Sequence, residues 1–159
     1  MMENFDFIEM TIPAKAEYIG VIRLSISGIA NRMGFSYESI EDLKVAISEA
    51  ITNAVTHAYD GENEGEITLG FGVYEDRLEV MVADRGVSFN LNEVRKEIGP
   101  FKDTESVENL REGGFGLFLI NTLMDKVEIH DNQGIIIIMT KYINETGVGL
   151  DDDQVSTTL

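Results

Sequence analysis

The stretch EAITNAVTH, residues 49–57, holds more information about fold and function than any other part of this chain. At 3.6 residues per turn, Glu49, Asn53 and His57 fall on one face of a helix. That face would carry a proton acceptor, an amide oxygen suited to a hard metal ion, and an imidazole. The interleaved alanines predict open space beside this polar row, as a bound ligand would require. A solvated helix face is the alternative interpretation, and the row alone favours it slightly.

The composition of the chain limits its function. Its 159 residues suit one domain, and 43% of them are hydrophobic, which is enough for a sizeable core. The absence of cysteine excludes disulfides, thiolate metal sites and thiol catalysis. The net charge of −17 argues against nucleic acids and anionic membranes as partners. A basic protein partner and a plain solubility role are both compatible with it.

The chain shows no targeting or membrane segment. Its first residues lack a basic region followed by an apolar run, which argues against a signal peptide. The longest apolar run, residues 134–139, is too short to span a bilayer. We therefore expect a cytoplasmic protein.

Hydrophobic periodicity predicts the order β-α-α-β-β-lid-α-β-β. The expected strands cover residues 5–12, 66–73, 77–83, 126–130 and 135–142, and the expected helices cover 14–33, about 36–58 and 116–125. Residues 84–114 form a long irregular segment, typical of a lid, with a short helix near 91–98. Gly34 is predicted to end the first helix, and Ser36 to cap the second.

This order predicts an α+β two-layer sandwich, with helices on one face of a mixed, mostly antiparallel sheet. Residues 1–145 are expected to form a single domain. Residues 146–159 are acidic and glycine-containing, so we expect a disordered tail.

Two further motifs follow the helical row. Asp84-Arg85-Gly86 comes directly after an apolar strand, where a carboxylate can accept a hydrogen bond from an exocyclic amine such as that of adenine. The alternative is an ordinary strand-to-turn sequence. Gly114 and Gly116 precede or open an apolar helix, where free N–H groups make a phosphate site. A flexible hinge explains these glycines about equally well.

In this order, the motifs resemble those of the GHKL ATP-binding superfamily, whose members share the Bergerat fold. The helix Glu49-x-x-x-Asn53 is similar to the N box, Asp84-x-Gly86 to the G1 box, and Gly114-x-Gly116-Leu117 to the G2 box. The resemblance implies contacts with ATP from Asn53, His57, Asp84, Gly86, Gly114, Phe115, Gly116, Leu117 and Thr140.

The resemblance is more specific to the anti-sigma factor serine kinases, in particular the RsbW-like proteins of the general stress response. It is carried by residues 41–59, 71–80, 112–117 and 139–142. The similarity runs from Asp6 to about Asn144. It implies a homodimer that binds a sigma-B-type sigma factor and keeps it from RNA polymerase. It also implies a kinase that uses ATP and Mg²⁺ to phosphorylate a serine of an anti-anti-sigma protein.

Carried over by residue, the resemblance implies that Glu49 is the catalytic base and Asn53 the Mg²⁺ ligand. Arg23, on the first helix, lies where a relative uses an arginine to meet its partners, and a solvated charge explains it equally well. Arg111 does not stand directly before the Gly-rich loop, because Glu112 intervenes, so a phosphate-binding role for Arg111 is not expected. Two alternatives to a kinase are a non-catalytic, ATP-dependent sigma-binding module and a free ATPase.

Overall fold

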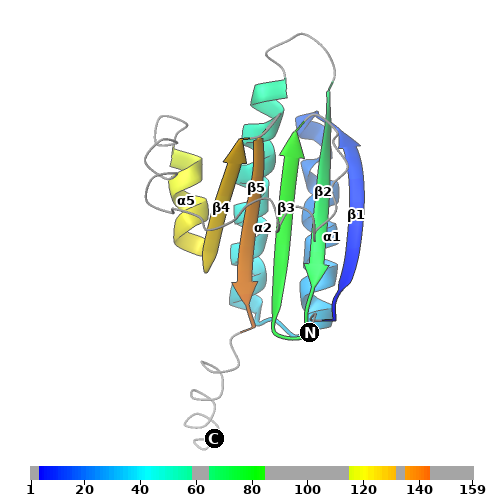
Figure 1. The fold of residues 1–159 in the computed structure, drawn as a ribbon, viewed down its shortest axis with the longest axis vertical. Coiled ribbons are helices and arrows are strands. Elements are labelled where there is room, and N and C mark those ends of the chain that lie inside the picture. The colour runs from blue at the N-terminus through cyan, green and yellow to red at the C-terminus, as the bar shows by residue number, and fades with distance from the viewer. Residues whose placement is uncertain (1–3, 59–64, 85–114, 132–134, 144–159) are drawn as a thin grey trace, which may run out of the picture.

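The computed structural model describes residues 4–58, 65–84, 115–131 and 135–143. Its elements follow the predicted order (Figure 1). They are β1 (Asp6–Pro13), a short 3-10 turn (Ala16–Tyr18), α1 (Ile19–Met33), α2 (Tyr37–Ala58), β2 (Glu66–Val73), β3 (Arg77–Asp84), α5 (Phe115–Leu123), β4 (Lys126–Asp131) and β5 (Ile135–Tyr142). The lid, the short helix near residues 91–98 and the C-terminal tail lie outside the described residues.

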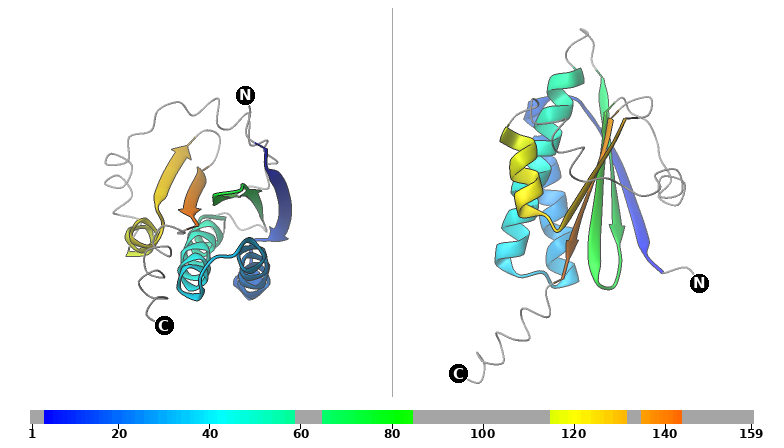
Figure 2. Two further views of the ribbon diagram at one scale, coloured as in Figure 1. Left: turned by 90° about the horizontal axis from the view of Figure 1, so that it is seen from below. Right: turned by 60° about the vertical axis from the view of Figure 1, so that its left-hand side comes forward.

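The five strands form one sheet in the order β1-β2-β3-β5-β4, and each of the four neighbouring pairs is antiparallel. The three helices lie on one face of this sheet, with α2 between α1 and α5 (Figure 2). The predicted α+β sandwich is therefore confirmed. None of the helices in the described part of the chain is long and apolar enough to cross a membrane.

Local sequence sets the ends of the first two helices, as predicted. Gly34 has φ 98°, and its N–H donates to the carbonyl oxygens of Ala30 and Asn31 at 3.2 and 3.1 Å. Glycine adopts this left-handed conformation without steric cost, so α1 ends here. Ser36 Oγ accepts a hydrogen bond from the N–H of Ser39 at 3.1 Å, which satisfies a free donor at the start of α2.

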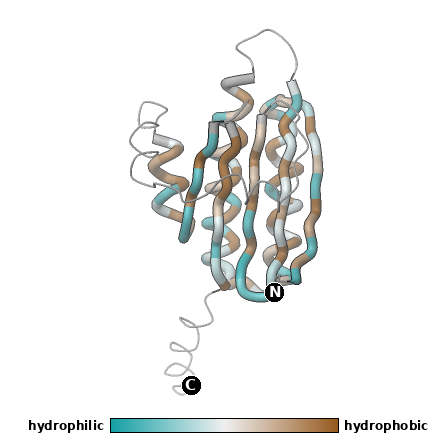
Figure 3. The backbone as a smooth tube through the Cα atoms, viewed as in Figure 1, coloured by the Kyte–Doolittle hydropathy of each residue, from teal (hydrophilic) through white to brown (hydrophobic). Residues whose placement is uncertain are grey.

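The main hydrophobic core lies between the helices and the sheet. Strand alternation directs Ile67, Leu69 and Phe71 of β2 into it, together with residues of β3 and β5. The first half of β5 is an unbroken hydrophobic run (Figure 3). Ile137 packs in the main core, whereas Ile136 and Ile138 pack in a second, smaller cluster on the outer face. The sheet is therefore covered on its helical face and also buried at the centre of its outer face.

One expectation about α2 was wrong. The alanines at positions 46, 50 and 54 do not leave open space beside the polar row. Their side chains are at most 8% exposed and belong to the main core, where small residues let α2 approach the sheet closely. The side chain of Ala58 lies outside the described residues.

Candidate functional site

The polar row of α2 is present as predicted over its first two members. Glu49 and Asn53 are one turn apart on α2, and both are half-buried. His57 lies in the last turn of α2, but its side chain is outside the described residues. Several other polar side chains of α2 are buried to a similar degree, so the contacts of Glu49 and Asn53 decide their role.

Gly116, the second residue of α5, lies directly against this row. A Cβ atom built at position 116 would be 2.7 Å from Glu49 Oε1 and 3.8 Å from Asn53 Nδ2. The first of these distances is shorter than a carbon–oxygen contact allows, so a side chain here would displace the Glu49 carboxylate. The N-terminus of α5, whose first backbone N–H groups have no partner within the helix and where the helix dipole is positive, thus meets the row.

Asn53 has an unsatisfied polar atom at this contact. Its Nδ2 is buried and has no hydrogen-bond partner among the described residues. A buried donor without a partner costs about 1–3 kcal/mol, so such groups usually mark a position where a ligand or water binds. A phosphate or water oxygen would satisfy this donor, and the oxygen of the same amide could then bind a cation.

The chemistry of these side chains fits Mg²⁺ bound through a nucleotide. The described residues contain no group of three or more His, Cys, Asp and Glu side chains that could hold a metal ion. Mg²⁺ does not require such a group, because it commonly takes one or two protein oxygens and completes its shell with phosphate and water. Asn53 would supply an amide oxygen, and the adjacent helix N-terminus would bind phosphate.

Asp84 is the last residue of β3, where it pairs with Ile67 of β2. The end of β3, the last turns of α2 and the start of α5 lie at the same end of the molecule (Figures 1 and 2). The structure therefore places the backbone of Asp84, the first residue of the predicted G1 box, at the same end of the molecule as the start of α5 (Figure 1). Gly86 and Gly114 lie outside the described residues, as do the side chains of Asp84 and Phe115.

Comparison with known proteins agrees with this arrangement. A model described as a histidine kinase-like ATPase domain matches residues 12–141, which include Glu49, Asn53, Asp84 and Gly116. A protein of Oceanobacillus iheyensis named serine-protein kinase RsbW is 64% identical over 99% of each chain. A protein of the same name from Bacillus cereus is 57% identical over 99% of this chain and 98% of its own.

The chain belongs to the RsbW family of serine-protein kinases, within the histidine kinase-like ATPases. A crystal structure of the RsbU and RsbW domains of a Mycobacterium tuberculosis protein has the same fold, with a TM-score of 0.60 at 19% identity. That similarity covers 86% of this chain and 32% of the longer one.

One residue predicted at the ATP site of this RsbW-family chain, Thr140, faces away from the Glu49–Gly116 contact. Thr140 is on β5 between Glu79 of β3 and Lys126 of β4, and it is 5% exposed. Its neighbour Met139 packs in the helix-side core, so alternation directs Thr140 to the outer face, away from Glu49. Leu117 packs against the main core.

Arg23 is not part of the Glu49–Gly116 contact. It is exposed on α1, and α2 separates α1 from α5 in the helical layer (Figure 2). Leu24, beside it, is 76% exposed, and Val21 is 46% exposed. The α1 surface is therefore a separate, partly apolar region of the RsbW-family fold.

Sequence reasoning missed Lys141 and Asp42, which connect three elements below the site. Lys141 Nζ donates to the carbonyl oxygen of Leu123 at 2.7 Å and lies 3.5 Å from Asp42 Oδ2. A signal was available in the sequence. Lys141 shares the alternation of Ile137 and Met139, and a lysine in such a core-facing position requires an acceptor.

Proposed function

We propose that this chain is an anti-sigma factor and a protein-serine kinase. It binds a sigma-B-type sigma factor, and it transfers the γ-phosphoryl group of Mg-ATP to a serine of its anti-anti-sigma antagonist. The observation that carries the proposal is the contact of Gly116 with Glu49 and Asn53. This contact unites a general base, an amide for the metal and a phosphate-binding helix terminus, which are the parts that phosphoryl transfer requires.

In the proposed reaction, the serine hydroxyl of the partner attacks the γ-phosphorus while Glu49 accepts the hydroxyl proton. The bond from the γ-phosphorus to the bridging oxygen breaks, and ADP leaves. The N–H groups at the start of α5 would hold phosphate oxygens, and Asn53 would hold the metal through its amide oxygen. Mg²⁺, when bound, supplies positive charge that offsets the charge on the phosphates.

The remaining ATP contacts follow from family membership. Asp84 accepts a hydrogen bond from the adenine amine, and Gly86 lets the base approach the backbone. Gly114 adds an N–H group at the phosphates, and His57 orients the end of α2 or contacts the lid. Asp84 is the last residue of β3, and the end of β3 lies at the same end of the molecule as the start of α5 (Figure 1), which supports the first of these assignments.

We assign partner binding to the exposed face of α1. Residues 19–33 contain two arginines and no acidic residue, although the chain carries a net charge of −17. The exposed side chains of Arg23 and Leu24 together would suit a partner surface that is acidic and apolar. A homodimer located in the cytoplasm, as the sequence motifs led us to expect, completes the proposal.

The test is transfer of label from γ-³²P-ATP, with Mg²⁺, to the purified anti-anti-sigma protein. We expect label on one serine, and loss of transfer by about 10²–10⁴-fold in Glu49→Gln, with ATP binding largely kept. Glu38→Gln is the matched control, because Glu38 is an exposed carboxylate in the first turn of the same helix.

Two other outcomes would replace the kinase proposal. Capture of sigma factor without any transfer by the wild-type chain would indicate a binding module. Rapid ATP hydrolysis without a protein partner would indicate a free ATPase. Pull-downs of sigma factor in ATP and in ADP separate these alternatives.

A further inference from the structure

Helices α2 and α5 are joined at two points along their length. At one point, Glu49 of α2 lies against Gly116 of α5. At the other, the ammonium group of Lys141 lies between Asp42 of α2 and the carbonyl oxygen of Leu123, the last residue of α5. Because the earlier residue of α2 is linked to the later residue of α5, the two helices run antiparallel.

The spacing of the two contacts is the same on both helices. Positions 42 and 49 are seven residues apart on α2, and positions 116 and 123 are seven apart on α5. At 1.5 Å per residue, both intervals measure about 10 Å. A contact at one end of α5 therefore fixes the position of the whole helix along α2. It also determines which residue of α5 meets Glu49 at the other end.

The Lys141 contact is suited to hold α5 in this way. The lysine side chain is 13% exposed, so its hydrogen bond at 2.7 Å to Leu123 is shielded from water. The last carbonyl groups of a helix lack partners within the helix and carry the negative end of its dipole, which favours a cation there. Lys141 belongs to a central strand of the sheet, so its backbone is a rigid support.

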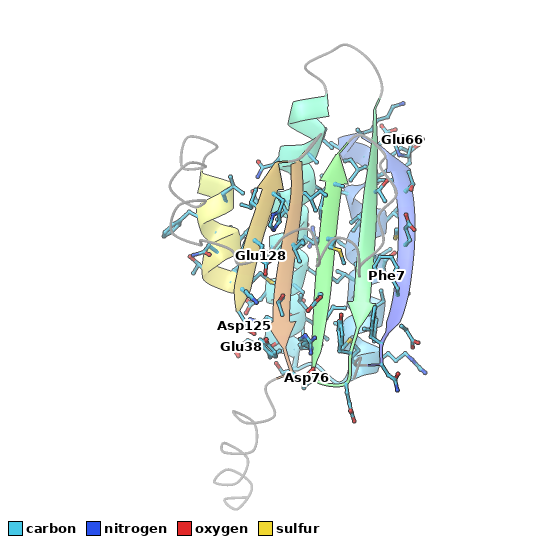
Figure 4. All side chains as sticks on the ribbon, in the orientation of Figure 1. Phe7, Glu38, Glu66, Asp76, Asp125 and Glu128 are labelled. Atoms are coloured by element: carbon cyan, nitrogen blue, oxygen red, sulfur yellow. The ribbon has the colours of Figure 1, made fainter. Side chains whose placement is uncertain are left out.

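A second connection holds the same end of the helix. The N–H of Asp125 donates to the carbonyl oxygen of Thr140 at 3.0 Å, and Asp125 Oδ2 accepts from the N–H of Tyr142 at 2.7 Å. Figure 4 shows Asp125 at the same end of the molecule as Glu38, which lies in the first turn of α2. The C-terminal end of α5 is thus connected to β5 on both sides of Lys141, while its N-terminal end meets the candidate site.

We infer that Lys141, with Asp42 and the Leu123 carbonyl, sets the register of α5 along α2 and thereby positions Gly116 against the Glu49 carboxylate. Lys141 is a positioning residue: it acts through α5 from about 10 Å away. Its effect on catalysis rests on the proposed kinase function, whereas its effect on the register does not.

The register can be measured without kinase activity. The chain has no cysteine, so Val45→Cys on α2 and Asn121→Cys on α5, both at exposed positions, give a unique pair of spin labels. In Lys141→Met, which keeps the length of the side chain but loses the donor, we expect the distance between the labels to shift or broaden by about 1.5 Å or more. Lys141→Arg, which restores a donor, should return the wild-type distance.

Lys44→Met is the matched control. Lys44 also forms a carboxylate ion pair, at 3.1 Å, but its partner Glu41 belongs to the same helix. This variant should therefore keep the wild-type distance. If Lys141→Met folds poorly, Asp42→Asn tests the same connection with a smaller expected shift, because the bond to Leu123 remains.

The kinetic consequence is measured in parallel. A misplacement of about 1 Å can cost up to 100-fold in rate, so we expect transfer by Lys141→Met to fall between about tenfold and 100-fold, with recovery in Lys141→Arg. An unchanged label distance in Lys141→Met and Asp42→Asn would overturn the inference, whatever the activity. Failure of the wild-type chain to transfer phosphate would overturn the proposed function and leave the distance result valid.

Discussion

The glycines of α1 and α5 lie on the same side of the sheet but in opposite environments. A Cβ atom added at Gly20 or Gly28 of α1 would meet nothing within 4 Å, whereas one added at Gly116 of α5 would meet Glu49 Oε1 at 2.7 Å. Glycine inside a helix costs roughly 0.5–1 kcal/mol relative to alanine. At Gly116, packing within the described part of the chain explains why glycine is needed despite this cost. At Gly20 and Gly28 of α1, the same packing does not explain it.

This difference separates two kinds of functional surface. The α5 glycine lies where a carboxylate and an amide must approach a helix N-terminus. The α1 glycines flank Leu24, which is 76% exposed, on a helix without acidic residues. A surface of this kind allows a second helix to approach closely. Glycine would therefore be needed at these positions only when a partner is bound.

Of the substitutions that test this comparison, Asn53→Ala should have the largest effect. Loss of the metal amide should lower transfer on the order of 1000-fold, since electrostatic help from a metal is worth several kcal/mol. The free energy of unfolding should rise, by up to about 1–3 kcal/mol, because the variant removes the unsatisfied Nδ2. Kinase assays over a Mg²⁺ titration and thermal unfolding of the same samples measure both. A large fall in melting temperature would contradict a ligand-binding role for Asn53.

Gly116→Ala tests the crowded glycine directly. The new methyl group would displace the Glu49 carboxylate, which is the end of a flexible side chain and can move at little cost in stability. We expect transfer to fall by about 10²-fold, while the melting temperature changes by no more than about 3 °C. Equal losses of rate and of folded protein would instead make Gly116 a packing residue.

Leu24→Ala tests the α1 surface. Truncation of an exposed side chain should leave stability and ATP affinity nearly unchanged, but it should weaken the sigma complex by about 1–2 kcal/mol, or roughly five- to thirtyfold. Tyr37→Ala is the control, because Tyr37 is 78% exposed at the start of α2. Calorimetric titration with sigma factor measures the difference, and equal effects of the two substitutions would argue against an α1 interface.

Gly28→Ala should have the smallest effect, and it should stabilise the protein. Alanine has a higher helix propensity, and nothing lies near its added Cβ, so we expect a gain of about 0.5–1 kcal/mol in stability. This gain corresponds to a rise of about 1–4 °C in melting temperature, with the affinity for ATP unchanged. Destabilisation by Gly28→Ala would show that the two glycine environments are more alike than the structure indicates.

The elements of the fold were predictable because their signals are local. The left-handed Gly34 ends α1 and Ser36 caps α2, as their positions indicated. The turn sequences beside them placed β2 and β5 at the residues where the structure has them. For α5, which was expected over residues 116–125, the structure has Phe115–Leu123, and such differences at helix ends are normal.

The candidate site was predictable only in part. The four-residue spacing of Glu49 and Asn53 placed them together, but the same reasoning misread the buried alanines as open space. Thr140 was assigned by its place in the last strand, whereas the face on which it lies depends on the register of β5 with β3 and β4. A one-residue change in register reverses every side chain of a strand, and motif order does not contain that information.

The sequence by itself determined the order of the elements, the caps of the helices and the one-turn spacing of Glu49 and Asn53, because each depends on residues a few positions apart. Only the tertiary structure decided that Gly116 lies against Glu49, that Lys141 joins α5 to α2, and that Thr140 is on the outer face. These contacts join residues far apart in the chain. They exist because the sheet and the packing of α5 on α2 bring those residues together.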